Sequence, residues 1–126
     1  MIRIFLASAA IFGGLSVAAG AFASHALKEQ LSASSLSIFE TGARYQMYHA
    51  LALLAVALLL TRTESPAPPT LVAAGVAFIA GVAIFSGSLY ALSLTGIKWL
   101  GAVTPVGGAA FIIGWGCLAA AAFSFK

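Results

Sequence analysis

Four long stretches of mostly uncharged, apolar residues are the feature that most constrains how this chain can fold. They run from about 2 to 24, 45 to 61, 70 to 94 and 104 to 125, and Arg3 is the only charged residue within them. An α-helix rises ~1.5 Å per residue and the hydrocarbon core of a bilayer is ~30 Å thick, so each stretch is near the length of a membrane span. The sequence therefore predicts an all-α, polytopic membrane protein with four transmembrane helices in an antiparallel bundle.

Composition supports a single membrane domain over residues 1–126. Hydrophobic residues make up 62% of the chain and charged residues 7%, whereas roughly 25% of a soluble domain is charged. The six basic and three acidic residues are dispersed, and without a basic run no nucleic-acid partner is expected. Cys117 is the only cysteine, which excludes an intrachain disulfide and a thiol metal site.

The first apolar stretch has two interpretations. Ala21-Phe22-Ala23 has the small-x-small form of a secretory cleavage site, and Arg3 precedes the apolar run. However, the uncharged segment from Ile4 to Ser24 is longer than the roughly 7 to 15 apolar residues of a signal peptide. We therefore interpret the segment as an uncleaved first span.

The segment between spans one and two, about 25–44, is predicted to contain an interfacial helix. Ser37-x-x-Glu40 matches a capping box, and Leu31, Leu36, Ile38 and Phe39 provide an apolar face among polar neighbours. Both features favour a helix over 33–44 that leads into span two. A helix that begins nearer Ser32 is the alternative, and it would place Ser37 in the helix interior.

The fourth span is predicted to begin at Thr104-Pro105, as N-cap and first helical residue. Small residues at four-residue spacing also predict close contacts between membrane helices. The glycines predicted to pack against other helices are Gly14, Gly20, Gly81 and Gly107.

Polar side chains collect on one face of the predicted bundle. Because successive spans run in opposite directions, the ends of spans one and three meet the starts of spans two and four. The side chains predicted there as a polar network or small-ligand site are His25, Glu40, Arg44, Tyr45, Gln46, His49, Ser88 and Tyr90.

His49 is the most informative member of this group. It lies one turn into the predicted second span, where an ionisable side chain is costly without a partner, and His25 is the candidate partner. Glu40 and Arg44 have the spacing of a helical ion pair. The group either binds a small ligand, a lipid headgroup, a proton or a metal, or it holds spans one and two together by hydrogen bonds. We favour the second interpretation.

Signatures of catalysis or metal binding are weak. The chain has no H-x-x-x-H or E-x-x-H pair on one helix, and no G-x-S-x-G, Walker or Rossmann motif. Haem bound by His25 and His49 is a remote alternative, because both lie on the same side of the bundle. We expect no catalytic residue, no bound metal and no cofactor.

Three segments form a recognisable combination: GAFASHAL at 20–27, IFETGARYQMYHALALL at 38–54 and FSGSLYALSLTGIKWLGAVTPVGGAAFIIGW at 85–115. Together they resemble the YgdD/YwdK-type family of small bacterial inner-membrane proteins, a domain of unknown function with eukaryotic transmembrane relatives. The resemblance covers nearly the whole chain. It implies a four-helix protein of the bacterial inner (plasma) membrane with no established activity and no known catalytic residues.

Two further hypotheses stand beside the metal or haem alternative. The first is a non-enzymatic packing, adaptor or lipid-interacting protein, whose partners are membrane lipids, a second copy of the chain or another membrane protein. The second is an oligomeric transporter of a small solute or a proton. Arg3 ahead of the first span mildly favours cytoplasmic N- and C-termini, although the count of Lys and Arg is equal on the two faces.

Overall fold

The computed structural model describes all residues 1–126 and consists of helices and the turns that join them. The main helices are α1 (Ile2–His25), α2 (Ala33–Leu60), α3 (Pro69–Gly81), α4 (Gly87–Thr95) and α5 (Leu100–Ala121). A π-helical segment, Val82–Ser86, joins α3 to α4, and short 3₁₀ turns occupy Leu27–Glu29 and Ala122–Ser124. Four stretches are long and apolar enough to cross a membrane: Ile2–His25, Ala33–Leu60, Pro69–Thr95 and Leu100–Ser124. The predicted all-α fold with four spans is confirmed.

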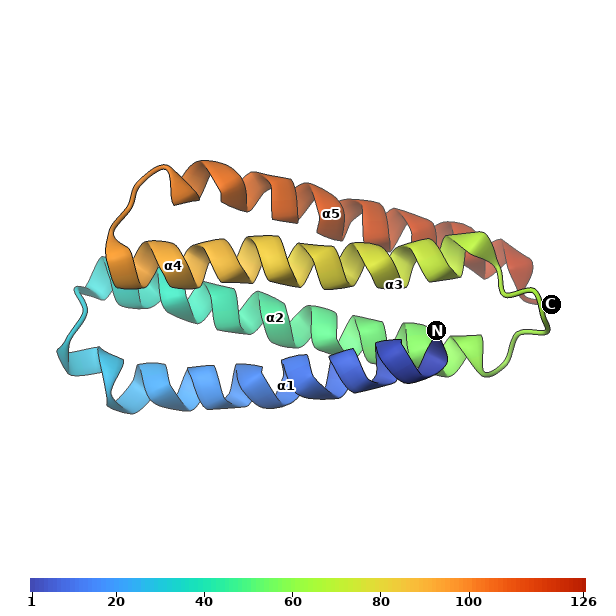
Figure 1. The fold of residues 1–126 in the computed structure, drawn as a ribbon, viewed down its shortest axis with the longest axis horizontal. Helices are drawn as coiled ribbons and strands as arrows, with labels where there is room; N and C mark the ends of the chain where they lie inside the picture. The colour runs from blue at the N-terminus through green and yellow to red at the C-terminus, as the bar shows by residue number, and fades with distance from the viewer.

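The helices are arranged in the order α1, α2, α3 with α4, and α5 (Figure 1). The most extensive packing joins α1 to α2 and α3 to α5, while α2 also packs against α3 and α4. Half of the apolar window of α2 is buried, against 17% in α1 and 22% in α5. The outer helices α1 and α5 therefore present most of their apolar surface to the surrounding lipid.

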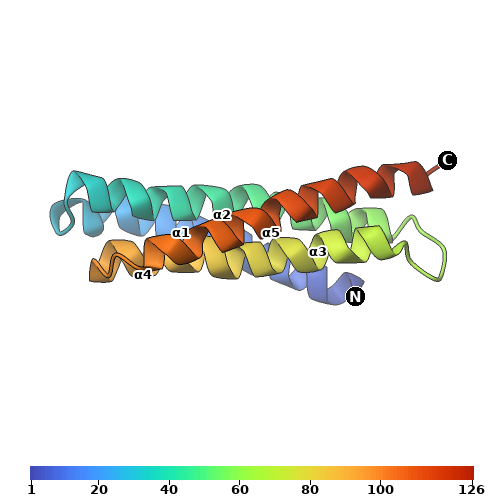
Figure 2. The same cartoon turned by 90° about the horizontal axis from the view of Figure 1, so that it is seen from above.

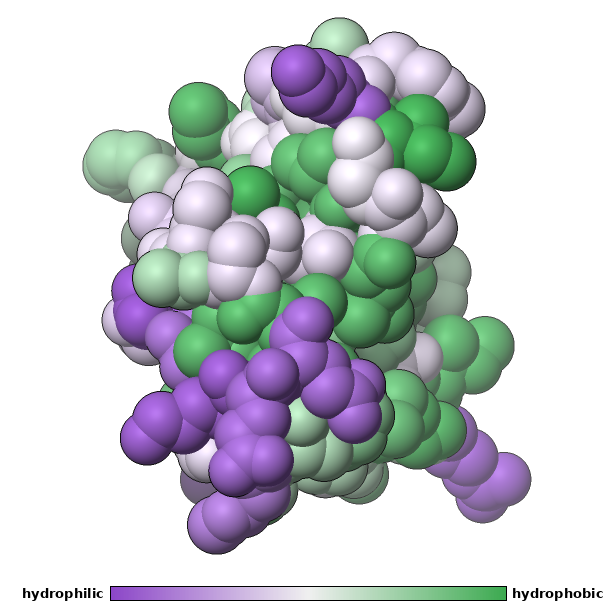
Figure 3. All heavy atoms as spheres, turned by 90° about the vertical axis from the view of Figure 1, so that its left-hand side faces the viewer, coloured by the Kyte–Doolittle hydropathy of each residue, from purple (hydrophilic) through white to green (hydrophobic).

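The two ends of the bundle differ. Both chain termini and the loop from α2 to α3 lie at one end, which we call the termini end (Figures 1 and 2). The α1–α2 and α4–α5 connections lie at the other, the linker end. Figure 3 faces the linker end and shows most of its hydrophilic side chains over the α1–α2 connection, where Lys28, Glu29 and Gln30 are exposed.

Helix α2 begins earlier than the predicted second span. The Ser32 hydroxyl caps the helix by accepting a hydrogen bond from the backbone N–H of Ser35 (3.1 Å), so Ser37 lies in the helix interior and caps nothing. Residues 33–44 are helical as expected, but they are continuous with the span instead of forming a separate helix. The helix therefore begins at Ala33, before the predicted start of the second span at residue 45, and Gln46 and His49 lie near the middle of α2.

Helix α5 also begins before its predicted start. Gly96, with φ of 71°, ends α4, and α5 begins at Leu100 with Trp99 at the N-cap position. Thr104 is therefore not an N-cap, and Pro105 lies inside the helix. The Thr104 hydroxyl donates instead to the carbonyl oxygen of Leu100 (3.3 Å).

Phenylalanine rings pack directly onto glycines where helices cross. A Cβ added to the glycine would lie 2.3 Å from Phe5 at Gly75, 2.3 Å from Phe111 at Gly81 and 2.6 Å from Phe78 at Gly114. These rings belong to the main hydrophobic core. Because a glycine has no side chain, each ring can lie against the backbone of the neighbouring helix.

The four glycines predicted at helix contacts have two different environments. Gly81 and Gly107 lie at close approaches between helices, and at Gly107 the neighbour is the backbone of Phe85. Gly14 and Gly20 face open space, with no atom within 4 Å of an added Cβ. Neither Gly14 nor Gly20 therefore marks a close helix contact within the chain.

Candidate functional site

Gln46 joins three helices near the middle of the bundle. Its side chain is 5% exposed. The amide Nε2 donates to the carbonyl oxygen of Phe12 in α1 (2.8 Å), and the amide Oε1 accepts a hydrogen bond from the Tyr90 hydroxyl in α4 (2.7 Å). One residue of α2 thus connects α1 with α4.

His49, one turn further along α2, connects α2 with α5. Its Nδ1 lies 2.7 Å from the carbonyl oxygen of Tyr45, and the indole Nε1 of Trp115 donates to its Nε2 (3.0 Å). An indole nitrogen can only donate, so Nε2 accepts and Nδ1 must carry the proton. These partners assign the neutral imidazole with its proton on Nδ1. The ring also stacks on Phe111, with centroids 3.5 Å apart.

Hydroxyl groups make further connections between helices. They bond to backbone carbonyls of α2 or to each other, and all three serines involved are buried. The bonds are Ser16 Oγ to Ala43 O (2.6 Å), Ser86 Oγ to Gly42 O (2.7 Å) and Ser88 Oγ with Thr104 Oγ1 (2.6 Å).

Together these side chains form a band of hydrogen bonds between the helices that extends over several turns, from Thr104 to Trp115 along α5. We call it the polar layer: Ser16, Gln46, His49, Ser86, Ser88, Tyr90, Thr104 and Trp115. Every buried side-chain nitrogen and oxygen in the protein has a hydrogen-bond partner. The hydrogen bonds between different helices therefore give the buried polar groups their partners and also hold the bundle together.

The predicted pairing of His25 with His49 is wrong. His25 is exposed at the linker end of α1. Ser16 bonds to Ala43 and Phe12 bonds to Gln46, so the antiparallel register places His25 beside the first turn of α2. At ~1.5 Å per residue, this position is roughly 20 Å from His49 along the helix.

Glu40, Arg44 and Tyr45 lie outside the polar layer. Arg44 and Tyr45 are exposed and Glu40 is partly exposed. Glu40 and Arg44 line a shallow groove of about 510 Å³ between α1 and α2, together with Tyr48 and small residues of α1. The structure thus separates the predicted residues: Gln46, His49 and Ser88 are buried and Tyr90 is partly buried within the bundle, and only Gln46 and Tyr90 bond to each other. The others lie on the surface of the bundle.

Four members of the polar layer are absent from the predicted group: Ser16, Ser86, Thr104 and Trp115. Trp115 is the one that bonds to His49. A tryptophan within an apolar span was the available signal, because a partly buried indole N–H usually finds an acceptor. The acceptor could not be chosen from the sequence, because His49 is distant in the chain and packing sets the register between α2 and α5.

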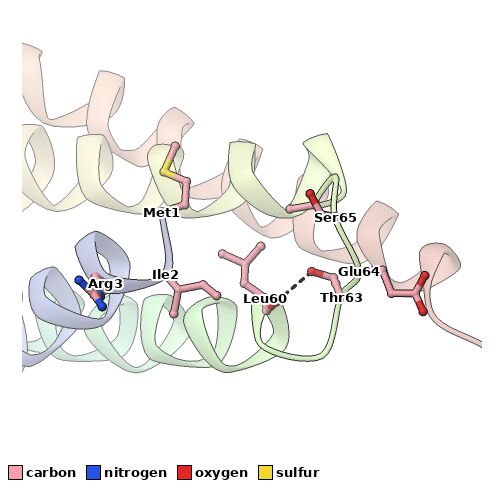
Figure 4. A pocket seen from close by; sticks show the side chains of 8 residues that line it. Met1, Ile2, Arg3, Leu60, Thr63, Glu64 and Ser65 are labelled. Carbon is pink, nitrogen blue, oxygen red and sulfur yellow. Dashed lines mark hydrogen bonds between the residues drawn. The ribbon is translucent and has the colours of Figure 1, made fainter.

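A second cavity lies at the termini end. It holds about 430 Å³ between the start of α1 and the loop after α2, and Arg3 and Glu64 are its charged lining residues. Figure 4 shows the Glu64 carboxylate pointing away from Arg3. Thr63 donates to the carbonyl oxygen of Leu60 (2.9 Å) and closes the first turn of the loop. The charged groups do not converge on one point.

Fold and polar layer define the class: an integral membrane protein of four spans whose buried polar side chains connect its helices. The family model described as "Protein of unknown function (DUF423)" matches residues 19–108, and the chain belongs to this family. The resemblance inferred from the three sequence segments is thereby confirmed.

Named relatives cover nearly the whole chain. The UPF0382 membrane protein YwdK of Bacillus subtilis is 42% identical over 123 residues, 98% of either chain. A UPF0382 membrane protein of Haemophilus influenzae is 41% identical over 97% of this chain and 95% of its own. The UPF0382 inner membrane protein YgdD of Escherichia coli is 37% identical over 98% of this chain and 92% of its own. No solved structure is a significant match.

Proposed function

We propose that this protein is a non-enzymatic membrane scaffold, which acts by presenting its outer helices to membrane lipids and to a membrane-protein partner. The observation that carries the proposal is that every buried side-chain nitrogen and oxygen has at least one hydrogen-bond partner within the protein. Gln46 and His49 are buried polar side chains, and their amide and ring atoms bond to neighbouring helices and to α2 itself. The hydrogen bonds of these two side chains hold neighbouring helices of the bundle together.

Transport by the predicted polar group receives no support from the geometry. Such a pathway would need its titratable side chains to follow one another across the membrane. His25 and Arg44 are on the surface, whereas His49 is enclosed by Phe111 and Trp115. These side chains therefore do not follow one another along a path through the bundle.

The outer face of α1 is the surface we assign to partners. This helix packs mainly on α2 and is the least buried of the four spans. Gly14 is exposed, with space for a close neighbour, and small residues are the means by which membrane helices approach one another. A second copy of the chain or a different membrane protein would suit this face.

Photo-crosslinking in native membranes tests the scaffold proposal. A benzophenone amino acid replaces Val17 on α1 or Ile112 on α5, both of which are well exposed. We expect a discrete protein adduct from Val17 and only bulk-lipid adducts from Ile112. The Ile112 variant is the matched control, because it samples the lipid-facing side of the other outer helix. Bulk-lipid adducts alone from both positions would contradict an adaptor role.

We also propose that the chain resides in the inner, or plasma, membrane with both termini in the cytoplasm. The name of the Escherichia coli relative supports the location, and Arg3 at the start of α1 supports the orientation. The expected result is labelling of Gln30→Cys by a membrane-impermeant maleimide in intact cells, and labelling of Ser65→Cys only after lysis. Both variants carry Cys117→Ala. The reverse pattern would invert the proposed topology.

A further inference from the structure

A groove lies between α1 and α4 in the linker-end half of the bundle. Its volume is about 490 Å³, within the roughly 300 to 1,000 Å³ of small-molecule sites. Residues of α1, α2 and α4 line it: Leu15, Ala18, Ala19, Phe22, Phe39, Gln46, Tyr90 and Leu94. Several of these side chains are exposed within spans long enough to cross the membrane. The groove is therefore open to the hydrocarbon of the bilayer.

The lining combines aromatic walls with one polar position. Phe39 and Tyr90 are in contact, with ring centroids 4.8 Å apart, and Phe22 is on the α1 side. The polar position is the Gln46–Tyr90 pair of the polar layer. No charged residue lines the groove.

The Gln46–Tyr90 pair retains unused hydrogen-bonding capacity. A primary amide has two N–H groups, and Gln46 Nε2 uses one of them for the carbonyl of Phe12. The Tyr90 hydroxyl donates its proton to Gln46, which leaves its oxygen lone pairs able to accept. A ligand in the groove would thus meet one N–H donor and one oxygen acceptor at the edge of a 95% buried amide.

These features discriminate among membrane lipids. A phospholipid headgroup would bring a phosphate into a groove without a cation, and its desolvation would be uncompensated. A plain acyl chain would fill the space but leave the amide N–H without a partner. A neutral lipid with an aromatic-like ring, a carbonyl or hydroxyl oxygen and an apolar tail satisfies all three elements of the lining.

We propose that this groove binds an isoprenoid quinone, with a ring oxygen on the Gln46 amide, the ring beside Phe39 and Tyr90, and the prenyl tail in the bilayer. The inference names the lipid class for the scaffold's lipid-interacting role and rests on that role. Val17 does not line the groove, so crosslinking from Val17 tests the scaffold independently of quinone binding.

The test is a titration of the purified full-length protein in lipid nanodiscs with decylubiquinone, followed by quenching of tryptophan fluorescence. Trp99, which is exposed at the linker end, is replaced by Phe in every protein tested, so that the signal comes from Trp115, whose indole bonds to His49, one turn from Gln46. We expect saturable quenching. Ala18→Phe fills the groove from an exposed position and should weaken binding at least about tenfold. Ala21→Phe, on an exposed position of α1 outside the groove, is the matched control and should bind as the wild type does.

A second variant guards against an indirect effect of the added ring. Phe22→Ala removes an exposed wall of the groove and is expected to weaken binding about threefold without changing thermal unfolding. Phosphatidylglycerol with short acyl chains should not displace the quinone. Unsaturable quenching, equal affinities for the two alanine-to-phenylalanine variants, or displacement by phosphatidylglycerol would each overturn the proposal.

Discussion

Gly107→Ala is expected to lower the free energy of unfolding by roughly 2 to 3 kcal/mol, which is large for one added methyl group. A Cβ at Gly107 would lie 2.3 Å from the backbone nitrogen and 2.7 Å from the Cα of Phe85. A side chain could rotate away, but a helix backbone cannot. Relief of the clash therefore requires α5 to move away from the π-helical segment that contains Phe85.

The matched control is Gly116→Ala in the same helix. Nothing lies within 4 Å of an added Cβ at Gly116, and alanine is favoured over glycine in a helix by up to about 1 kcal/mol. This variant should be as stable as the wild type or slightly more stable. Unfolding by sodium dodecyl sulfate in mixed micelles measures both free energies. Equal stabilities of the two variants would refute the close approach at Gly107.

The spans were predictable because apolar length alone determines them. A helix in hydrocarbon satisfies its own backbone, so a stretch of about 20 apolar residues has no stable alternative. The start of α2 was not predictable in the same way, because residues 33–44 are more polar than the span that follows. The helix of 28 residues is roughly 42 Å long, which exceeds the ~30 Å hydrocarbon thickness. Its first turns can therefore be polar and still be continuous with the span.

Contacts between helices were much less predictable than the helices. The approach of Gly107 to Phe85 depends on the local π-helical turn, Val82–Ser86, for which the sequence contains no obvious signal. Gly14 and Gly20 have the same kind of small-residue spacing as Gly81, yet only Gly81 is covered by a ring. The spacing of small residues shows which helix faces allow a close approach. Which of these faces are covered depends on how the neighbouring helix packs.

The polar layer illustrates the same limit. Sequence reasoning selected Gln46, His49, Ser88 and Tyr90 because polar side chains in a membrane need partners. It chose His25 as the partner of His49, because both were expected near one membrane edge. Once α2 extends back to Ala33, His49 moves to the middle of the bundle and meets Trp115 instead. His25 was chosen as the partner of His49 because His49 was placed near the membrane edge, whereas it lies in the middle of the bundle.

His49→Ala should lower the free energy of unfolding by about 3 kcal/mol, the scale for truncating a buried ring. The change removes the ring that stacks on Phe111 and leaves the Trp115 N–H without its acceptor. His25→Ala, at an exposed position of α1, is the control and should change stability by less than about 0.5 kcal/mol. Unfolding in mixed micelles compares the two variants directly.

A double-mutant cycle separates the hydrogen bond from the loss of packing. Trp115→Phe removes the N–H donor and keeps an aromatic ring, so the effects of His49→Ala and Trp115→Phe should overlap when the two changes are combined. Hydrogen bonds between membrane helices contribute about 0.6 kcal/mol on average and up to about 1.7 kcal/mol, and the coupling should fall in this range. Strict additivity would mean that the bond contributes nothing to stability. Since the scaffold proposal depends on polar groups that hold the helices together, that result would remove its main support.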